Sequence, residues 1–134
     1  MKVIVSDPIS KDGLNILYEN NIEVIDATDA IIDQNYEHIP TANGWVIRSG
    51  TTLDGSIISK ADNLSVIGRA GVGIDNIDIF AATRKGVVVM NTPDANTISA
   101  AEHTMALILS LSRNITYSHH SILNGEWNLS LIHI

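Results

Sequence analysis

Two arginines, Arg48 and Arg69, stand at the ends of apolar runs that are typical of buried β-strands. A guanidinium can hold a carboxylate or a phosphate through two parallel hydrogen bonds. Because the carboxyl ends of parallel strands meet at one edge of a sheet, these positions predict a site for a small anion. The alternative is that each arginine pairs with a nearby acid, such as Asp7 or Asp75.

A glycine-rich loop, residues 68–73 with the sequence G-R-A-G-V-G, surrounds the second arginine. Glycine lets consecutive backbone N–H groups approach an anion closely. The dinucleotide fingerprint G-x-G-x-x-G would need glycine in place of Asn76, and the Gly-Lys-Ser/Thr of a phosphate-binding P-loop is absent. Taken without its flanks, the loop could serve only a tight turn.

His103 follows Glu102 in a predicted helix, a pair that could suit catalysis or metal binding. The nearest further histidines, His119 and His120, lie well beyond the reach of His103 along the chain, so the spacing of a metal site is missing. No serine stands on a recognisable strand-to-helix elbow, which a Ser-His-Asp hydrolase would need. We therefore expect a structural or interdomain role for Glu102 and His103, and no metal site.

The composition excludes several classes of function. The chain has 134 residues, with 8 Lys+Arg against 15 Asp+Glu, a formal net charge of −7 and no cysteine. This length suits one modest domain, and the negative charge disfavours nucleic acid and anionic membranes as partners. Without cysteine there are no disulfides and no thiol chemistry. Since no apolar run is long enough for a membrane span or a signal peptide, we expect a cytoplasmic protein.

Short apolar runs rich in β-branched residues must position the arginines. Each run is nearly continuous rather than alternating, as expected for a parallel strand covered on both faces. With helical patterns between them, the five runs predict an α/β fold, a doubly wound parallel sheet of about five strands. The predicted strands are Val3–Val5, Ile22–Ile25, Trp45–Ile47, Leu64–Ile67 and Val87–Met90.

Capping residues mark the helices of the crossovers. Ser10 and Asp54 are suited to start two of them, and the segment Asp75–Asp78 offers polar caps for a third that ends at Gly86. Residues 34–39, before a proline, are compatible with a further short helix.

A long helix is predicted from about Thr97 to Tyr117, capped by Asn96 or Thr97. It has two apolar stripes, and a helix that is apolar on most sides needs partners on most sides. We therefore expect something outside the chain to pack there, and the isolated chain to self-associate. The first stripe is Ile98, Ala101, Met105, Ile108 and Leu109, and the second is Ala100, Thr104, Leu107, Leu111 and Ile115.

Three stretches resemble the family of D-isomer-specific 2-hydroxyacid dehydrogenases. They are L-S-V-I-G-R-A-G-V-G-I-D-N-I-D at 64–78, A-A-T-R-K-G-V-V-V-M-N-T-P at 81–93 and N-T-I-S-A-A-E-H-T-M-A-L at 96–107. The resemblance implies a flavodoxin-like substrate domain and the cofactor NAD. It is nearest to the branch of the family that oxidises 3-phospho-D-glycerate to 3-phosphooxypyruvate in serine biosynthesis. Another 2-hydroxy acid, as in the glyoxylate and hydroxypyruvate reductases, is the alternative within the family.

The resemblance also implies roles for individual residues. Arg48 and Ser49, in R-S-G-T, and Arg69, in G-R-A-G, match substrate contacts, and the two arginines suit the phosphate. The backbone of Ala70, Gly71 and Val72 matches the cradle for the substrate carboxylate. Asn96 matches another polar contact with the substrate, and Val72 a van der Waals contact with the nicotinamide part of NAD.

The family's domain organisation implies the first two of three parts in this chain, and the third is expected because the last six residues, L-S-L-I-H-I, match the translation of a common sequencing adaptor. A genuine terminal strand is the alternative for those six residues. Residues 1–95 would be the N-terminal portion of the substrate domain, 96–128 the interdomain helix and the start of the NAD domain, and 129–134 a non-native tail. The family's dinucleotide fingerprint and its catalytic arginine, glutamate and histidine have no counterparts here. We therefore expect no catalytic residue in this chain, no activity of the chain alone, and homo-oligomers formed through the long helix region. The alternative from another class is an anion-binding module without chemistry.

Overall fold

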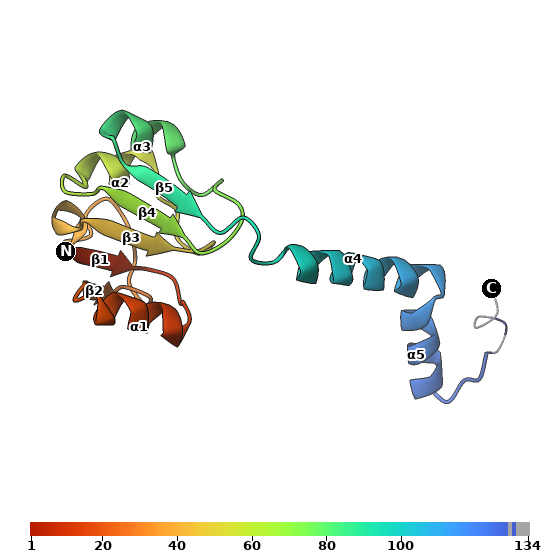
Figure 1. Ribbon diagram of the computed structural model, residues 1–134. Helices are drawn as coiled ribbons and strands as arrows, with labels where there is room; N and C mark the ends of the chain where they lie inside the picture. Colours follow the sequence, from red (N-terminus) through yellow and green to blue (C-terminus); the bar gives the residue numbers. More distant parts are fainter. Residues whose placement is uncertain (129, 131–134) are drawn as a thin grey trace. The chain divides into compact units, whose positions relative to one another are not determined.

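The computed structural model describes residues 1–128 and 130. Its strands form one sheet in which all neighbouring pairs are parallel, in the order β2-β1-β3-β4-β5 (Figure 1). This order is that of flavodoxin-like sheets, so the predicted α/β doubly wound fold is confirmed. The strands are β1 (Lys2–Val5), β2 (Glu23–Asp26), β3 (Gly44–Ile47), β4 (Val66–Arg69) and β5 (Val88–Asn91).

The parallel register aligns one apolar row across four strands. Ile4, Trp45 and Ile67 are at most 1% exposed, and the row ends on the partly buried Val89. The row packs against buried residues of α2 (Gly55–Lys60) and α3 (Ile79–Lys85) in a single core cluster. Burial of these large apolar side chains is the main stabilising contribution to the fold.

The helices divide between the two faces of the sheet. Helix α1 (Lys11–Glu19) joins β1 to β2, whereas α2 and α3 join β3 to β4 and β4 to β5. Crossovers between parallel strands are right-handed, and these connections run in opposite directions along the sheet. Helix α1 therefore lies on the face opposite α2 and α3. This arrangement places the carboxyl end of β3 at the point, between β1 and β3, where the strand order reverses, and the carboxyl end of β4 beside it.

The predicted helix starts are confirmed by capping hydrogen bonds. Ser10 Oγ accepts from Gly13 N–H at 3.2 Å, and Asp54 Oδ1 accepts from Ile57 N–H at 3.0 Å. Asp78 Oδ1, at the end of the segment expected to cap the third helix, accepts from Ala81 N–H at 2.9 Å. That helix stops at Gly86, whose positive φ of 73° is the left-handed conformation that glycine adopts easily.

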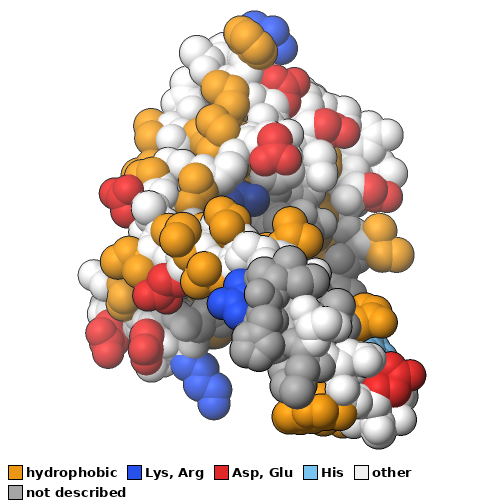
Figure 2. All heavy atoms as spheres, turned by 90° about the vertical axis from the view of Figure 1, so that its right-hand side faces the viewer, with side chains coloured by type: hydrophobic (Ala, Val, Ile, Leu, Met, Phe, Trp, Pro, Cys, Tyr) orange, Lys and Arg blue, Asp and Glu red, His pale blue; other side chains and the backbone are white. Residues whose placement is uncertain are grey.

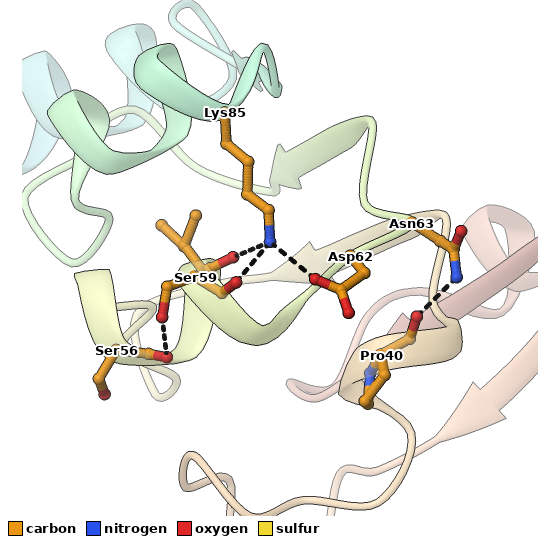
Figure 3. Close-up of polar contacts among 7 residues, drawn as sticks. Pro40, Ser56, Ser59, Asp62, Asn63 and Lys85 are labelled. Carbon is orange, nitrogen blue, oxygen red and sulfur yellow. Dashed lines mark hydrogen bonds and ion pairs between the residues drawn. The ribbon is translucent and has the colours of Figure 1, made fainter.

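Lys85 ties the end of α3 to the end of α2 (Figure 3). Its Nζ donates to the carbonyls of Ile58 at 2.9 Å and Ser59 at 2.7 Å, and lies 3.7 Å from a carboxylate oxygen of Asp62. The last carbonyls of a helix lack partners within the helix and carry partial negative charge, so a cation is favourable there. The ammonium group thus joins the two helices that cover the core.

Two helix predictions were wrong in extent. Residues 34–38 contain turns and no helix, and the helical segment is the short 3-10 helix η1 (Ile39–Thr41), because Pro40 fits the first turn of a helix better than its end. The long helix is divided into α4 (Thr97–Ser112) and α5 (Ile115–Leu123). Asn114 between them has a left-handed φ of 50°, a conformation that asparagine tolerates and that ends a helix.

The chain divides into two compact units, Met1–Ala95 and Asn96–Ile134. In the second unit α4 has no buried residue, and its apolar side chains are exposed, with Leu111 81% and Ile98 74% accessible. Exposed hydrophobic side chains are visible in orange over the surface in Figure 2. No helix among the described residues has the length and apolarity to cross a membrane. Residues 129 and 131–134 of the expected non-native tail lie outside the described residues.

Candidate functional site

Two loops at the carboxyl ends of β3 and β4 border adjoining hollows in the first unit. Residues 48–51, the Arg48 loop, follow β3, and residues 70–73, the glycine loop, follow β4. The two hollows share Val46 and Ala70. One is lined by Pro8, Ile9, Ser10, Gly13, Val46, Arg48 and Ala70, and the other by Val46, Gly68, Arg69, Ala70, Met90, Asn91 and Thr92. The fold thus brings the two predicted arginines to the same edge of the sheet.

The Arg48 side chain is exposed and is not neutralised by Asp7. Its Nη1 donates to the Pro8 carbonyl at 3.3 Å, and no described acid forms an ion pair with it. Asp7 is 7% exposed and instead accepts main-chain N–H groups, from Arg48 at 2.6 Å and from Thr51 at 3.1 Å. The Arg48 guanidinium is therefore available to an external anion.

The Arg69 side chain is half-buried and folds over its own loop. A Cβ on Gly71 would collide with its guanidinium, so a larger residue at that position would displace the arginine side chain. Nε of Arg69 is buried without a hydrogen-bond partner, and the guanidinium forms no ion pair with Asp75 or with any other described residue. Buried donors are nearly always satisfied in proteins. This donor is therefore a candidate to receive a ligand oxygen.

Two N–H groups of the glycine loop donate to carbonyls at the ends of β3 and β4, and two others are free. Ala70 N–H donates to the Ile47 carbonyl and Gly71 N–H to that of Arg69, both at 2.8 Å. The N–H groups of Val72 and Gly73 meet no acceptor among the described residues. Of the three residues expected to cradle a carboxylate, Val72 offers a free N–H, and Gly73 adds a second that the sequence had not singled out.

Asn91 and Thr92 hold the carbonyl side of the glycine loop. Asn91 Nδ2 donates to the Val72 carbonyl at 2.7 Å, and Thr92 N–H donates to that of Gly71 at 3.0 Å. With its carbonyls fixed in this way, the loop has its remaining N–H groups preorganised rather than mobile. The only sequence signal for Gly73 was its place as the last glycine of the loop.

The remaining predicted residues differ in their placement. Ser49 is exposed in the Arg48 loop, and its N–H and that of Gly50 also find no acceptor within the described chain. Val72 presents an apolar side chain that is 41% exposed. Asn96 belongs to the second unit, where it precedes α4 without a side-chain capping bond, and Glu102 and His103 lie in that helix.

Hydrogen-bond donors dominate the surroundings of the two adjoining hollows. Arg48 and Arg69 line the two hollows, and the loops that follow β3 and β4 each add two consecutive free N–H groups beside them. The carboxylate of Asp7 is turned to main-chain donors. Guanidinium and backbone N–H groups together favour phosphate or carboxylate oxygens. The geometry therefore suits a small molecule with two anionic groups.

A family model for the catalytic domain of D-isomer-specific 2-hydroxyacid dehydrogenases matches residues 3–126. The chain belongs to this family. It is 48% identical over 129 residues to a D-3-phosphoglycerate dehydrogenase of Methanocaldococcus jannaschii, covering 96% of this chain and 24% of that enzyme. An enzyme of the same name from Archaeoglobus fulgidus is 44% identical over 127 residues, covering 95% of this chain and 24% of its own length. The chain thus spans about a quarter of the curated relatives it matches.

A solved structure shows the same likeness in three dimensions. The NAD+-bound 3-phosphoglycerate dehydrogenase of Entamoeba histolytica superposes with a TM-score of 0.68 at 32% identity, covering 82% of this chain and 38% of that one. The family membership inferred from the stretches around the glycine loop is thereby confirmed.

Proposed function

We propose that this chain is the substrate-binding part of an NAD-dependent D-3-phosphoglycerate dehydrogenase, which oxidises 3-phospho-D-glycerate to 3-phosphooxypyruvate. The observation that carries the proposal is the pair of neighbouring strand ends: Arg48 and Arg69 form no ion pair with a described acid, and the loop at each strand end has two free N–H groups. A phosphorylated hydroxy acid has two anionic ends, and the two guanidinium groups and the free N–H groups together offer donors for both. The names of the relatives support the same substrate.

In this proposal the two ends of the substrate bind different groups. The arginines Arg48 and Arg69 take the phosphate, because a guanidinium can make two parallel hydrogen bonds to it. The free N–H groups of Val72 and Gly73 take the carboxylate. The carbon chain between them would lie over Val46 and Ala70, which the two hollows share.

Among the described residues, we assign a contact with the cofactor only at its nicotinamide end. The exposed Val72 side chain lies next to the proposed carboxylate site and offers an apolar contact for a nicotinamide ring. When bound, NAD would accept the hydride from the carbon that carries the hydroxyl. No dinucleotide fingerprint occurs in the sequence, so the residues here hold and orient the substrate, and we assign no proton acceptor among them.

We also propose the wider setting of the chain. Residues 1–95 form the N-terminal portion of the substrate domain, and 96–128 the interdomain segment leading toward an NAD domain, so the chain alone lacks activity. The intact enzyme would be a cytoplasmic homo-oligomer assembled through the region of α4 and α5.

The experiment is calorimetric titration of the 134-residue chain with 3-phospho-D-glycerate and, in parallel, with D-glycerate. Arg69→Ala should weaken binding of the phosphorylated ligand by about 2–5 kcal/mol and that of D-glycerate much less. Arg84→Ala, which removes an exposed arginine from α3, is the matched control and should leave both ligands unaffected. Equal losses for the two ligands would contradict the phosphate assignment, and tighter binding of glyoxylate or hydroxypyruvate would move the substrate to another member of the family.

A further inference from the structure

The Arg48 loop is held at both ends by two side chains from distant parts of the sequence. Asp7 Oδ2 accepts the N–H groups of both end residues, Arg48 at 2.6 Å and Thr51 at 3.1 Å. Asn76 Nδ2 donates to the carbonyls of the same two residues, both at 2.6 Å. All four main-chain polar groups of the loop ends are thus satisfied by one carboxylate oxygen and one amide nitrogen.

The chemistry of the two side chains is complementary and not interchangeable. An ionised carboxylate only accepts hydrogen bonds, whereas an amide nitrogen only donates them. Oδ1 of Asn76 is buried without a partner, so this side chain keeps its orientation although one of its own polar atoms is left unsatisfied. Such an exception among buried polar groups calls for an explanation beyond the satisfaction of that side chain.

Both side chains stand on rigid supports. Asp7 comes two residues after the end of β1, and Asn76 lies beside the parallel bridge between Leu53 and Ile77, where its carbonyl accepts the N–H of Leu53 at 2.9 Å. Thr51, at the far end of the loop, donates its hydroxyl to Ser6 Oγ at 3.0 Å. The loop is therefore fixed to the core and not only to its neighbours.

The middle of the loop passes directly over the carboxylate. A Cβ on Gly50 would collide with Oδ1 of Asp7, so only glycine allows this close approach. Between the two fixed ends, the N–H groups of Ser49 and Gly50 remain free of any described acceptor, and the Arg48 side chain is exposed. The hydrogen bonds from Asp7 and Asn76 therefore fix the loop without occupying the groups that suit an anion.

We propose that Asp7 and Asn76 are positioning residues, which clamp the backbone of the Arg48 loop so that Arg48 and the N–H groups of Ser49 and Gly50 face the substrate phosphate. The inference rests on the proposed function, because it concerns the same anion site. A loop ordered before binding loses less conformational entropy when the ligand arrives. The clamp thus selects for the phosphorylated ligand without touching it.

The test uses Asn76→Leu, a neutral variant of similar size that has no donor. We expect 3-phospho-D-glycerate to bind about tenfold more weakly, with little change for D-glycerate, in NMR titrations of the isotope-labelled chain. In the absence of ligand, the amides of Ser49 and Gly50 should become more mobile in this variant. The control is Asn63→Leu, since Asn63 makes a single bond to the Pro40 carbonyl at 2.7 Å away from the site (Figure 3).

A second variant tests the same inference by displacing the loop rather than by removing a hydrogen bond. Gly50→Ala removes no polar group but pushes the loop away from Asp7, so it should lower the preference for the phosphorylated ligand in the same way. Unchanged affinity and loop order in both variants would overturn the clamp alone, and so would equal losses for both ligands, which a merely structural role predicts. If the wild-type chain bound no 3-phospho-D-glycerate, the proposed function and this inference would fail together.

Discussion

The two units of the chain use apolar residues in opposite ways. In residues 1–95 the central row of the sheet is at most 1% exposed at Ile4, Trp45 and Ile67, because α2 and α3 cover it. In α4 the sequence is just as apolar, yet none of its residues is buried. The comparison shows that an apolar sequence predicts that a segment needs to be buried. Which part of the protein covers that segment depends on the topology of the fold.

The largest expected effect is a difference in the free energy of unfolding between variants of the chain's two tryptophans. Trp45 is 1% exposed at the centre of the core, and its Nε1 donates to Ser6 Oγ at 2.9 Å, whereas Trp127 is 68% exposed. Trp45→Ala should lower the free energy of unfolding by about 3–5 kcal/mol through the cavity it leaves. Trp127→Ala should change it by less than about 0.5 kcal/mol.

Urea denaturation followed by circular dichroism measures both variants, since this signal does not depend on the tryptophans themselves. Equal destabilisation by the two variants would mean that the second unit has a core of its own. The difference in unfolding free energy between them is therefore a direct measure of how unevenly the two units are packed.

The exposed face of α4 is expected to drive self-association of the isolated chain. Exposed apolar patches of several hundred Å² are unusual on monomers, and Leu111 is 81% exposed. Leu111→Glu should weaken association by about tenfold, as measured by sedimentation equilibrium, and leave the stability of the first unit unchanged. Ser99→Glu adds the same charge at an exposed polar position of α4 and should have a much smaller effect. A monomeric wild-type chain at high concentration would contradict this expectation.

Most of the fold was predictable because its signals are local. Runs such as Val3–Val5 and Trp45–Ile47 indicate buried parallel strands, and Ser10 and Asp54 are typical helix caps whose bonds span only a few residues. The break at Asn114 was not predictable, since the apolar periodicity continues through it and asparagine accepts a left-handed backbone only in some contexts.

The candidate site was predictable in part, for the same physical reason. The arginines stand at strand ends, so their meeting follows from the topology. Which N–H groups stay free does not, because it depends on Gly71 N–H donating to the Arg69 carbonyl two residues earlier. The clamp could not be predicted either, since Asn76 reaches carbonyls 28 and 25 residues away in the sequence.

The smallest expected effect concerns the helix that follows the Arg48 loop and helps to cover the core. Hydrogen bonds from the Ser56 hydroxyl and from the Ile57 N–H lower the pKa of Asp54 below its ordinary value of 3.8. A carboxylate whose pKa is depressed in the folded state stabilises that state above its ordinary pKa, and this contribution is lost as the pH falls through the folded-state value.

Asp54→Ala should therefore lower the free energy of unfolding by about 1 kcal/mol at neutral pH, with the difference from wild type shrinking once the pH falls below 3.8. Because the carboxylate is almost fully exposed, solvent screening limits how much its charge contributes to the stabilisation by that cap. Asp29→Ala, at an exposed turn, is the control and should stay within about 0.5 kcal/mol of wild type. A difference for Asp54→Ala that persists unchanged into acid would show that the cap acts through packing of α2 rather than through the ionised carboxylate.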